Sequence, residues 1–561
     1  MEMRLRLNYE SFFNENDNIQ DLIEPLNKLD LLRAVSYITN KSRTEKDSIE
    51  TINNWFRNPL HKLNLIPITP TNTSILNIFS SLKLLNYIYE KEDIKTDVII
   101  DTDEFELRLF KTYLLLNSEQ DKIEKAGKDK LPQNGSDEHL SASLLIMAYH
   151  DHDLQNYILN EVFLTQFIKA IDFFQFIENE PKLASHLSLF LSTYNCKTWK
   201  EWTRNLLNLI IPVINHNDET YSEIQLEEDA NFEINSNFIN LFTVSIDYNE
   251  LPDFVSLRSN PILKIDEKTF IILSKLFLVE RIFKSVVFEF SLKINVSLPK
   301  ELQVKDFRSI YCDHFSEQVL LYNTLDKCFP NNNKWIKFRG EDFKKNGYSA
   351  EPDYYVRFKN KILLFESKDV ILKGKVKQSR DFSILSESLK EKFLKHGKDK
   401  KAILQIIENI KRLFSIYYTK IDNNYNIEHL NIYPILVVHD RQFDTPELNR
   451  LINIWFRNEI RENFNTKEIS KINDLVIINI DTLILYQEHF RKRGEYGLEI
   501  MINKYFEFIR PTIIKSKEEF RQKYLNTSIS FSLFVARKFD QTNFKNQPSY
   551  IENYIQKLDL K

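Results

Sequence analysis

One stretch in the second half of the chain limits its possible folds most. A polar segment ends in Pro352-Asp353, and an apolar run, residues 362–365, leads into Glu366-Ser367-Lys368. The apolar run has the length and composition of a buried strand. Side chains alternate between the two faces of a strand, so Glu366 and Lys368 share one face. The sequence therefore predicts two short strands joined by a tight turn.

The turn is predicted at Asn360-Lys361, which fixes the pairing of the two strands. In that register Asp353 lies opposite Lys368, and Tyr355 lies opposite Glu366. Both carboxylates and the lysine then lie on one face, where they form a candidate metal site.

The length of 561 residues exceeds what one hydrophobic core usually supports, so we expect several domains. Apolar residues at three- and four-residue spacing predict a mainly α-helical region over residues 1–215. An α+β connecting region is expected over residues 216–300. Residues 301–561 are predicted to form an α/β domain with a C-terminal helical extension, because helical patterns alternate there with apolar runs at 431–439 and 474–480.

Helical spacing in the first region is clearest over three ranges, each preceded by a candidate N-cap. These are residues 75–89 after Thr73, 105–116 after Thr102, and 140–176 after Ser136. Two glycines, a proline and an Asn-Gly pair predict a loop over residues 126–136. In the second half, a helix is expected over residues 445–464, with Thr445 as N-cap and Pro446 at the first helical position.

Composition narrows the class of protein. The net charge of -4 requires no polyanionic partner for the chain as a whole, so a nucleic-acid surface would be local. Three cysteines without paired spacing argue against a disulfide framework and a zinc site. The first residues lack the apolar core of a signal peptide, so we expect a cytoplasmic protein with no membrane partner. Only 8 glycines and no Walker or Rossmann pattern make an NTPase unexpected.

Pro352-Asp353, followed thirteen positions after Asp353 by Glu366-Ser367-Lys368, resembles the signature of the PD-(D/E)xK nuclease superfamily. Three further features agree: the apolar run before Glu366, a preceding helix with Glu317 and a later helix with Gln405. The resemblance covers residues 310–440. It implies a restriction-endonuclease-like domain with a central mixed sheet flanked by helices.

The resemblance also implies roles for six residues. Asp353 and Glu366 would bind Mg²⁺, or Mn²⁺, with the Ser367 carbonyl; Lys368 would act on the attacking water or the transition state; Glu317 would support the metal; Gln405 would lie beside the site. Carboxylate and carbonyl oxygens are the ligands that Mg²⁺ prefers. Glu351 lies two positions before Asp353, so in a strand that starts early its side chain would share the same face, and it is an alternative ligand.

The segment after the motif is basic, with 13 Lys and Arg against 6 Asp and Glu over residues 369–420. We expect Lys373, Lys375, Lys377 and Arg380 to contact the phosphate backbone of a nucleic acid. The alternative is a solvated helix face in a lysine-rich protein.

These features predict a Mg²⁺-dependent endonuclease that cleaves nucleic acid, with DNA as the expected substrate and a role in defence against foreign DNA. Residues 1–300 would control targeting or assembly, through a homo-oligomer or a partner protein. A catalytically inactive nuclease fold that binds nucleic acid or serves as a scaffold is one alternative, and an RNA-cleaving toxin is another.

Two further polar motifs are open to two interpretations each. His150-Asp151-His152-Asp153 suggests a metal-dependent phosphohydrolase, although a polar helix end or loop is the favoured interpretation. His439-Asp440 closes a buried strand and could approach the site from the end of the sheet, but a strand-to-helix turn is favoured.

Overall fold

The structure is a computed structural model that describes residues 5–41, 47–91, 100–131, 137–216, 220–244, 252–332, 334–492, 494–510, 517–539 and 549–559. The chain divides into two compact units. The first unit comprises residues 1–126, 154–170 and 181–303, and the second comprises residues 127–153, 171–180 and 304–561. The boundary expected after residue 300 lies close to the break at Gln303. The second unit, however, also contains two upstream stretches that the sequence assigned to the helical region.

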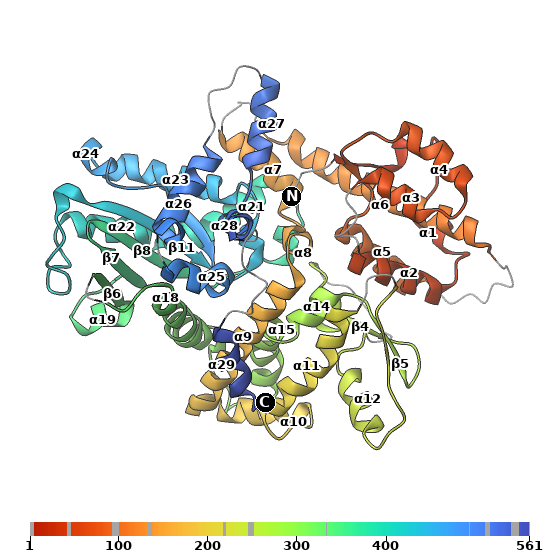
Figure 1. The fold of residues 1–561 in the computed structure, drawn as a ribbon, viewed down its shortest axis with the longest axis horizontal. Coiled ribbons are helices and arrows are strands. Elements are labelled where there is room, and N and C mark those ends of the chain that lie inside the picture. Colours follow the sequence, from red (N-terminus) through yellow and green to blue (C-terminus); the bar gives the residue numbers. More distant parts are fainter. Residues whose placement is uncertain are drawn as a thin grey trace. The chain divides into compact units, whose positions relative to one another are not determined.

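The second unit is built on a five-stranded mixed sheet with the strand order β12-β11-β8-β7-β6 (Figure 1). The strands are β6 (Trp335–Arg339), β7 (Tyr354–Phe358), β8 (Lys361–Lys368), β11 (Asn431–Val438) and β12 (Val476–Asn479). Strands β8, β11 and β12 run parallel, whereas β6, β7 and β8 form antiparallel pairs. The prediction of an α/β arrangement with a mixed sheet in the C-terminal half is therefore confirmed.

Helices cover both faces of this sheet (Figure 1). On one face lie α21 (Phe382–Phe393), α22 (Ala402–Phe414) and α23 (Leu448–Asn463). Ile406 of α22 shares a buried core with Ile362 and Leu364 of β8. Because side chains alternate along β8, its even-numbered residues point to this face, which we call the α22 face.

The opposite face is covered by α18 (Tyr322–Cys328), which packs against α25 (Ile480–Lys492). The Tyr322 ring lies 6.0 Å from that of Tyr354, and Phe329 lies 6.1 Å from Phe365 of β8. Odd-numbered residues of β8 therefore point to this second face, which we call the α18 face.

Strand β11 is apolar because it is buried in the middle of the sheet, as its sequence predicts. It pairs with β8 along its whole length, but its ladder with β12 begins only at Ile435. Pro434, which has no N–H to donate, lies just before that ladder. The prediction that the start of this strand lies at an edge is wrong, because β8 pairs with it from Asn431 and, on the other side, Ile432 bonds to the backbone of Lys471 and Asn473.

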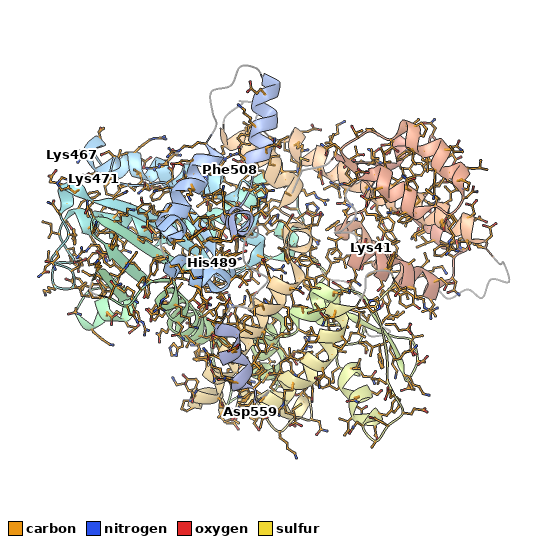
Figure 2. The ribbon with its side chains drawn as sticks, viewed as in Figure 1. Lys41, Lys467, Lys471, His489, Phe508 and Asp559 are labelled. Atoms are coloured by element: carbon orange, nitrogen blue, oxygen red, sulfur yellow. The ribbon has the colours of Figure 1, made fainter. Side chains whose placement is uncertain are left out.

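The amino-terminal end of β11 is closed by α24 (Thr466–Ile469) and the residues after it. Lys467 pairs with Glu428 at 2.8 Å, and the Lys471 ammonium donates to the Ile427 carbonyl at 2.7 Å. Figure 2 shows both lysines at one end of the sheet. The motif residues lie at the other end, where β8 and β11 finish.

The first unit is mainly helical, as predicted. Helix α2 (Lys28–Lys41) packs on α5 (Ile78–Glu90), and α3 (Ser48–Trp55) shares a core with α6 (Thr102–Asp129). A small antiparallel sheet contains β3 (Glu223–Gln225), β5 (Thr269–Ile272) and β4 (Ile262–Lys264), in that order. No helix in the described ranges has both the length and the hydropathy needed to cross a membrane.

Two of the predicted N-caps are wrong. Helix α5 is capped by Asn77 rather than Thr73, and its side chain accepts from the Ser80 N–H. The residue before α6, Asp101, caps that helix in place of Thr102 by accepting from the Glu104 N–H at 2.8 Å. In both cases an Asx side chain replaces a threonine, in agreement with its stronger capping preference. The third, Ser136, lies outside the described residues.

Three predicted boundaries also differ. The loop expected over 126–136 starts later, because α6 continues through Gly127 to Asp129. The helix expected over 140–176 is divided into α7 (Asp137–Ala148), the short α8 (His152–Gln155) and α9 (Leu159–Asn179). Helix α23 begins at Leu448, because the Thr445 hydroxyl bonds back to the Gln442 carbonyl and Glu447 has a φ of 72°.

Candidate metal centre

The hairpin that carries the motif turns one residue earlier than predicted. Phe358 lies opposite Lys361, so Lys359-Asn360 forms the loop. Lys359 has a φ of 54°, the left-handed conformation that two-residue hairpin loops require. The loop is therefore as short as predicted, but it is displaced.

This displacement changes which residues of the two strands lie opposite each other, but it leaves each side chain on its predicted face of the sheet. The predicted pairs, Asp353 with Lys368 and Tyr355 with Glu366, are wrong, because Tyr355 lies opposite Leu364. Continued by one residue, the observed register places Asp353 opposite Glu366. The register differs from the predicted one by two residues, which returns every side chain to its predicted face. Asp353, Glu366 and Lys368 thus share the α22 face.

Two short hydrogen bonds join the motif residues. The Asp353 carboxylate accepts from the Ser367 N–H at 2.7 Å. The Lys368 ammonium donates to Glu366 Oε1 at 2.6 Å, and the Glu366 side chain is only 2% exposed. The reserve ligand, Glu351, is instead paired with Lys344 at 3.4 Å.

Glu317 reaches the same place from another element. It lies on η5 (Tyr311–Leu321), a π-helix, and its Oε1 accepts from the Tyr322 hydroxyl at 2.7 Å. Its charge contributes to the pKa shifts of both Glu366 and Lys368. The structure therefore places Asp353, Glu366 and Lys368 on one strand face, with Glu317 near enough for its charge to act on Glu366 and Lys368.

The electrostatics show three carboxyls around one ammonium. Burial, followed by the charge of Asp353, raises the pKa of Glu366 to about 8 and that of Glu317 to about 7. Burial also raises the pKa of Asp353. Burial opposes the charge of Lys368, but Glu366 and Asp353 raise its pKa above the usual value. With all four groups ionised, two negative charges would be in excess, which is the charge that a divalent cation offsets.

The donor chemistry of this site fits Mg²⁺ or Mn²⁺. Within the described part of the chain, no three His, Cys, Asp or Glu side chains converge closely enough to form a complete ligand set. Mg²⁺ does not need one, since it commonly takes one or two carboxylates and completes its octahedron with water and phosphate oxygens. Asp353 and Glu366 offer such oxygens beside the excess negative charge.

Gln405 lies on α22, the helix that covers the motif face. Its amide oxygen is buried and has no hydrogen-bond partner among the described residues. Leaving a buried acceptor unpaired costs about 1–3 kcal/mol. No contact among the described residues joins Gln405 to Asp353, Glu366 or Lys368, so its place beside the site stays a prediction.

The predicted phosphate-binding residues separate into two pairs. Lys373 and Lys375 are exposed on and beside α20 (Gly374–Lys377). Lys377 and Arg380 are buried, and Lys377 pairs with Asp153 at 2.6 Å. A buried, paired ammonium cannot reach a phosphate backbone, so the predicted contacts are confined to Lys373 and Lys375.

Asp153 belongs to His150-Asp151-His152-Asp153, which lies at the junction of α7 and α8, at a helix end as predicted. All four residues are buried, however, rather than solvated. Burial lowers the pKa of His152 to about 4, which keeps this imidazole neutral near pH 7. The segment anchors the upstream stretch to the sheet domain through Lys377, and no metal-ligand set forms there among the described residues.

His439 does approach the motif from the end of the sheet, the interpretation that the sequence left open but did not favour, whereas Arg308 and Ser316 were missed. His439 follows β11, and its Nε2 lies 2.8 Å from the Ser367 hydroxyl. Asp369 is held by Arg308 and by Ser316, both upstream of the hairpin. Position at the carboxyl ends of neighbouring parallel strands is a signal for His439 and Asp369. Arg308 and Ser316 carry no comparable signal, because their contacts depend on how the helix packs.

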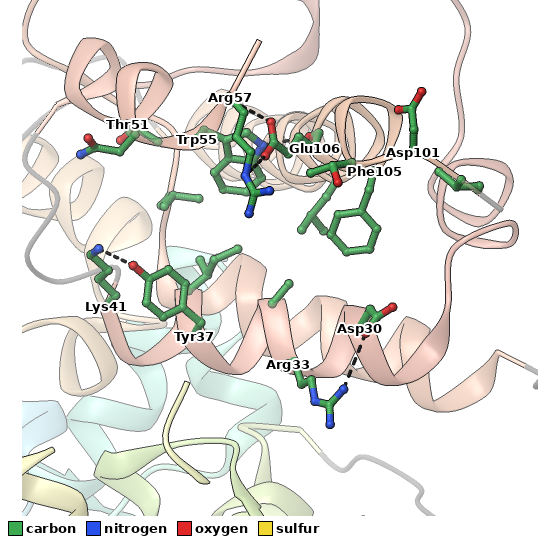
Figure 3. A pocket seen from close by; sticks show the side chains of 17 residues that line it. Asp30, Arg33, Tyr37, Lys41, Thr51, Trp55, Arg57, Asp101, Phe105 and Glu106 are labelled. Carbon is green, nitrogen blue, oxygen red and sulfur yellow. Dashed lines mark hydrogen bonds and ion pairs between the residues drawn. The ribbon is translucent and has the colours of Figure 1, made fainter. Parts of the chain in front are cut away.

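A separate cavity of about 520 Å³ lies in the first unit, between α2 and α6 (Figure 3). Its charged side chains already face partners. Arg33 pairs with Asp30 at 3.8 Å, Arg57 pairs with Glu106 at 3.6 Å, and Lys41 donates to the Tyr37 hydroxyl. Because its positive and negative groups balance, the cavity favours no class of charged ligand.

Known proteins offer no further guide to this site. Comparison of the chain with models of protein families, with curated proteins and with solved structures finds no match. A function can therefore be proposed only from the residues of the chain and their arrangement.

Proposed function

We propose that the chain is a metal-dependent nuclease whose second unit is a restriction-endonuclease-like domain. The observation that carries this proposal is that Asp353, Glu366 and Lys368 share one face at the carboxyl end of β8, where the Ser367 N–H holds Asp353 and Lys368 donates to Glu366. Three carboxyls around one ammonium are costly to bury unless a cation joins them. The resemblance of the motif to PD-(D/E)xK nucleases supports phosphodiester hydrolysis as the reaction.

In this proposal Asp353 and Glu366 hold Mg²⁺ or Mn²⁺ with the Ser367 carbonyl, and Glu317 supports a water ligand. The bound cation would lower the pKa of a coordinated water and offset charge on the attacked phosphate. Lys368, whose ammonium donates to Glu366 in the structure, would donate to the attacking water or to a phosphate oxygen. The unpaired Gln405 oxygen can accept a hydrogen bond from the same water.

DNA is the proposed substrate, by the same resemblance. The exposed Lys373 and Lys375 follow the motif directly and would bind phosphates next to the scissile bond. The proposed biological role is action against foreign DNA, with residues 1–300 controlling assembly or targeting.

Cleavage assays with defined variants test the proposal. The purified chain is incubated with supercoiled, linear, branched and single-stranded DNA and with RNA, in Mg²⁺, Mn²⁺ or EDTA. We expect metal-dependent cleavage that falls at least about 100-fold in Asp353→Asn and in Lys368→Met, while nucleic-acid binding persists. Asp399→Asn and Lys395→Met, at exposed positions of the β9–β10 hairpin (Lys395–His396, Asp399–Lys400), are the matched controls.

Three other outcomes are informative. Equal cleavage rates, or no cleavage, in the wild type and both site variants on every substrate would contradict the proposal that the chain is an enzyme. Metal-independent binding without cleavage would support an inactive nuclease fold that serves as a binding module. Cleavage confined to RNA would favour the alternative that the chain is an RNA-cleaving toxin.

A further inference from the structure

A hydrogen-bonded chain of side chains lies behind the candidate metal centre, on the α18 face of β8. His439 Nε2 is 2.8 Å from the Ser367 hydroxyl, and His439 Nδ1 is 3.1 Å from the Ser316 hydroxyl. Ser316 donates to Asp369 Oδ2 at 2.8 Å. Arg308 completes the chain by donating to Asp369 Oδ1 at 2.5 Å and to its carbonyl oxygen at 2.6 Å.

The donors and acceptors of this chain follow from the hydrogen bond between Ser316 and Asp369. The single hydroxyl hydrogen of Ser316 goes to Asp369, so Ser316 Oγ must accept from His439 Nδ1, which also lies 3.7 Å from Asp369 Oδ2. The other ring nitrogen, Nε2, accepts from the Ser367 hydroxyl in the neutral ring and donates to it in the imidazolium. Both ring nitrogens are thereby used, and the ring orientation is fixed.

The His439 ring connects three elements that build the metal centre. It comes from the end of β11, and Ser316 is the neighbour of Glu317 on η5. Ser367 lies between Glu366 and Lys368 on β8, and its N–H holds the Asp353 carboxylate at 2.7 Å. A rigid five-membered ring between two hydroxyls therefore sets the separation between the helix that carries Glu317 and the strand that carries Glu366.

We propose that His439 is a positioning residue of the metal centre. By bridging Ser316 and Ser367, it holds η5 against β8 and so keeps Glu317 close to the proposed metal ligands Asp353 and Glu366. This inference rests on the proposed function, because it needs a metal at Asp353 and Glu366. His439 itself lies on the opposite face of β8 and contacts neither the metal nor the substrate.

The proposal makes a specific demand on metal affinity. Loss of a side chain that orients a metal ligand typically costs about 10- to 100-fold in metal affinity or activity. A residue that only stabilises the core would instead lower the thermal midpoint and leave the metal dependence of the folded protein unchanged. The concentration of Mg²⁺ that gives half-maximal cleavage separates the two roles.

The test compares that Mg²⁺ concentration, the kcat at saturating Mg²⁺ and calorimetric Mn²⁺ binding across a variant set. The set is His439→Leu, His439→Gln, His439→Asn and Ser367→Ala, with His429→Leu at an exposed histidine as the control. We expect the Leu and Ala variants to need at least about tenfold more Mg²⁺, with a smaller loss of kcat at saturating metal. Gln can keep only the contact to Ser367 and Asn only that to Ser316, so each breaks the bridge and should need more Mg²⁺ than the wild type and less than the Leu variant.

The possible outcomes distinguish this inference from the proposed function. Unchanged metal dependence in Ser367→Ala and in a folded His439 variant would overturn the positioning role while the nuclease proposal stands. A wild type that neither binds Mn²⁺ nor cleaves would overturn the proposed function and this inference with it. If His439→Leu does not fold, the Mg²⁺ dependence of His439→Gln, His439→Asn and Ser367→Ala tests the positioning role instead.

Discussion

At the scale of single residues, the candidate site gathers three carboxyls around one lysine, and burial raises the pKa of all three. Glu366 is almost fully buried, and it shares Lys368 with Asp353 and Glu317. Such an arrangement favours binding of a cation over stability of the metal-free protein, a common compromise at functional sites. It follows that a substitution which damages function here should improve stability when metal is removed.

Glu366→Gln tests this trade-off. The amide oxygen can still accept from Lys368, while the carboxyl whose pKa is raised to about 8 can no longer ionise. At a pH above that value, we expect the thermal midpoint in EDTA to rise above that of the wild type, and the rise on adding Mn²⁺ to be lost. Differential scanning calorimetry with and without Mn²⁺ measures both, with the exposed Glu387→Gln as control. A lower midpoint in EDTA together with an intact Mn²⁺ response would contradict the trade-off.

A second residue, Asp444, predicts how stability depends on pH. Burial, with the charge of Asp481, raises its pKa to about 7, although Ser532 donates to it at 2.7 Å. A carboxyl with a raised folded pKa contributes stability that is full below the unfolded pKa and is lost as pH rises towards the folded pKa. Each pH unit between these values is worth up to about 1.4 kcal/mol.

We therefore expect Asp444→Asn to match the wild type near pH 4 and to become progressively more stable than it up to pH 7. Asparagine can accept the same hydrogen bond from Ser532 but cannot ionise. Urea unfolding at a series of pH values measures the difference between the two proteins. Parallel pH profiles would show that Asp444 does not titrate as inferred.

Several candidate site residues were accessible from sequence because their signal is local. Asp353, Glu366 and Lys368 lie within sixteen positions, and strand alternation alone places the last two on one face. Ser316 and Arg308 were not assigned to the site, and His439 was only the less favoured alternative there, because their contacts join segments far apart in the chain. The burial of Lys377 was also inaccessible, since it depends on Asp153 from an upstream stretch.

At the scale of elements, apolar pattern predicted the strands better than their register. The runs that became β8, β11 and β12 are apolar because the sheet buries them on both faces. The hairpin register was missed because Lys359-Asn360 and Asn360-Lys361 are equally plausible loops, and only packing selects between them. The helix caps were missed because the sequence offers an Asx residue beside or near each chosen threonine.

Helix α6 shows how a neighbouring element can override local preference. A Cβ built on Gly127 would lie 2.1 Å from the Arg380 carbonyl oxygen, so the close approach of the two backbones requires glycine. Gly127→Ala should therefore destabilise the protein, even though alanine favours a helix interior by about 1 kcal/mol. Thermal unfolding against Lys125→Ala, an exposed substitution on the same helix, measures this. A rise in the midpoint would mean that the two backbones separate freely.

At the scale of the whole molecule, the sheet domain is not made from one continuous segment. Leu145 and Tyr149, from the stretch that includes α7, belong to the same buried core as Ile362 of β8. Asp153 from the same stretch pairs with the buried Lys377, and both side chains are 2% exposed. Removing one partner of a buried ion pair typically costs about 3–5 kcal/mol.

A fragment of residues 304–561 should consequently fail to fold, although it contains every strand of the sheet and the whole motif. A fragment of residues 127–561, which restores α7 and Asp153, should unfold cooperatively. Circular dichroism during urea unfolding and size-exclusion chromatography compare the two. Cooperative unfolding of the shorter fragment, with the stability of the longer one, would show that the upstream stretch is dispensable.

The π-helix η5 has a consequence for how this protein tolerates changes in length. Its wider turn places Ser316 against His439 and, one position later, Glu317 towards the motif. Deleting one residue upstream of Ser316 within η5 would let the segment tighten into an ordinary α-helix, in which each residue turns by about 100°. The residues before and after the deletion would then be rotated relative to each other by that amount. A single deletion could thus disable the centre while every candidate ligand remains in the sequence.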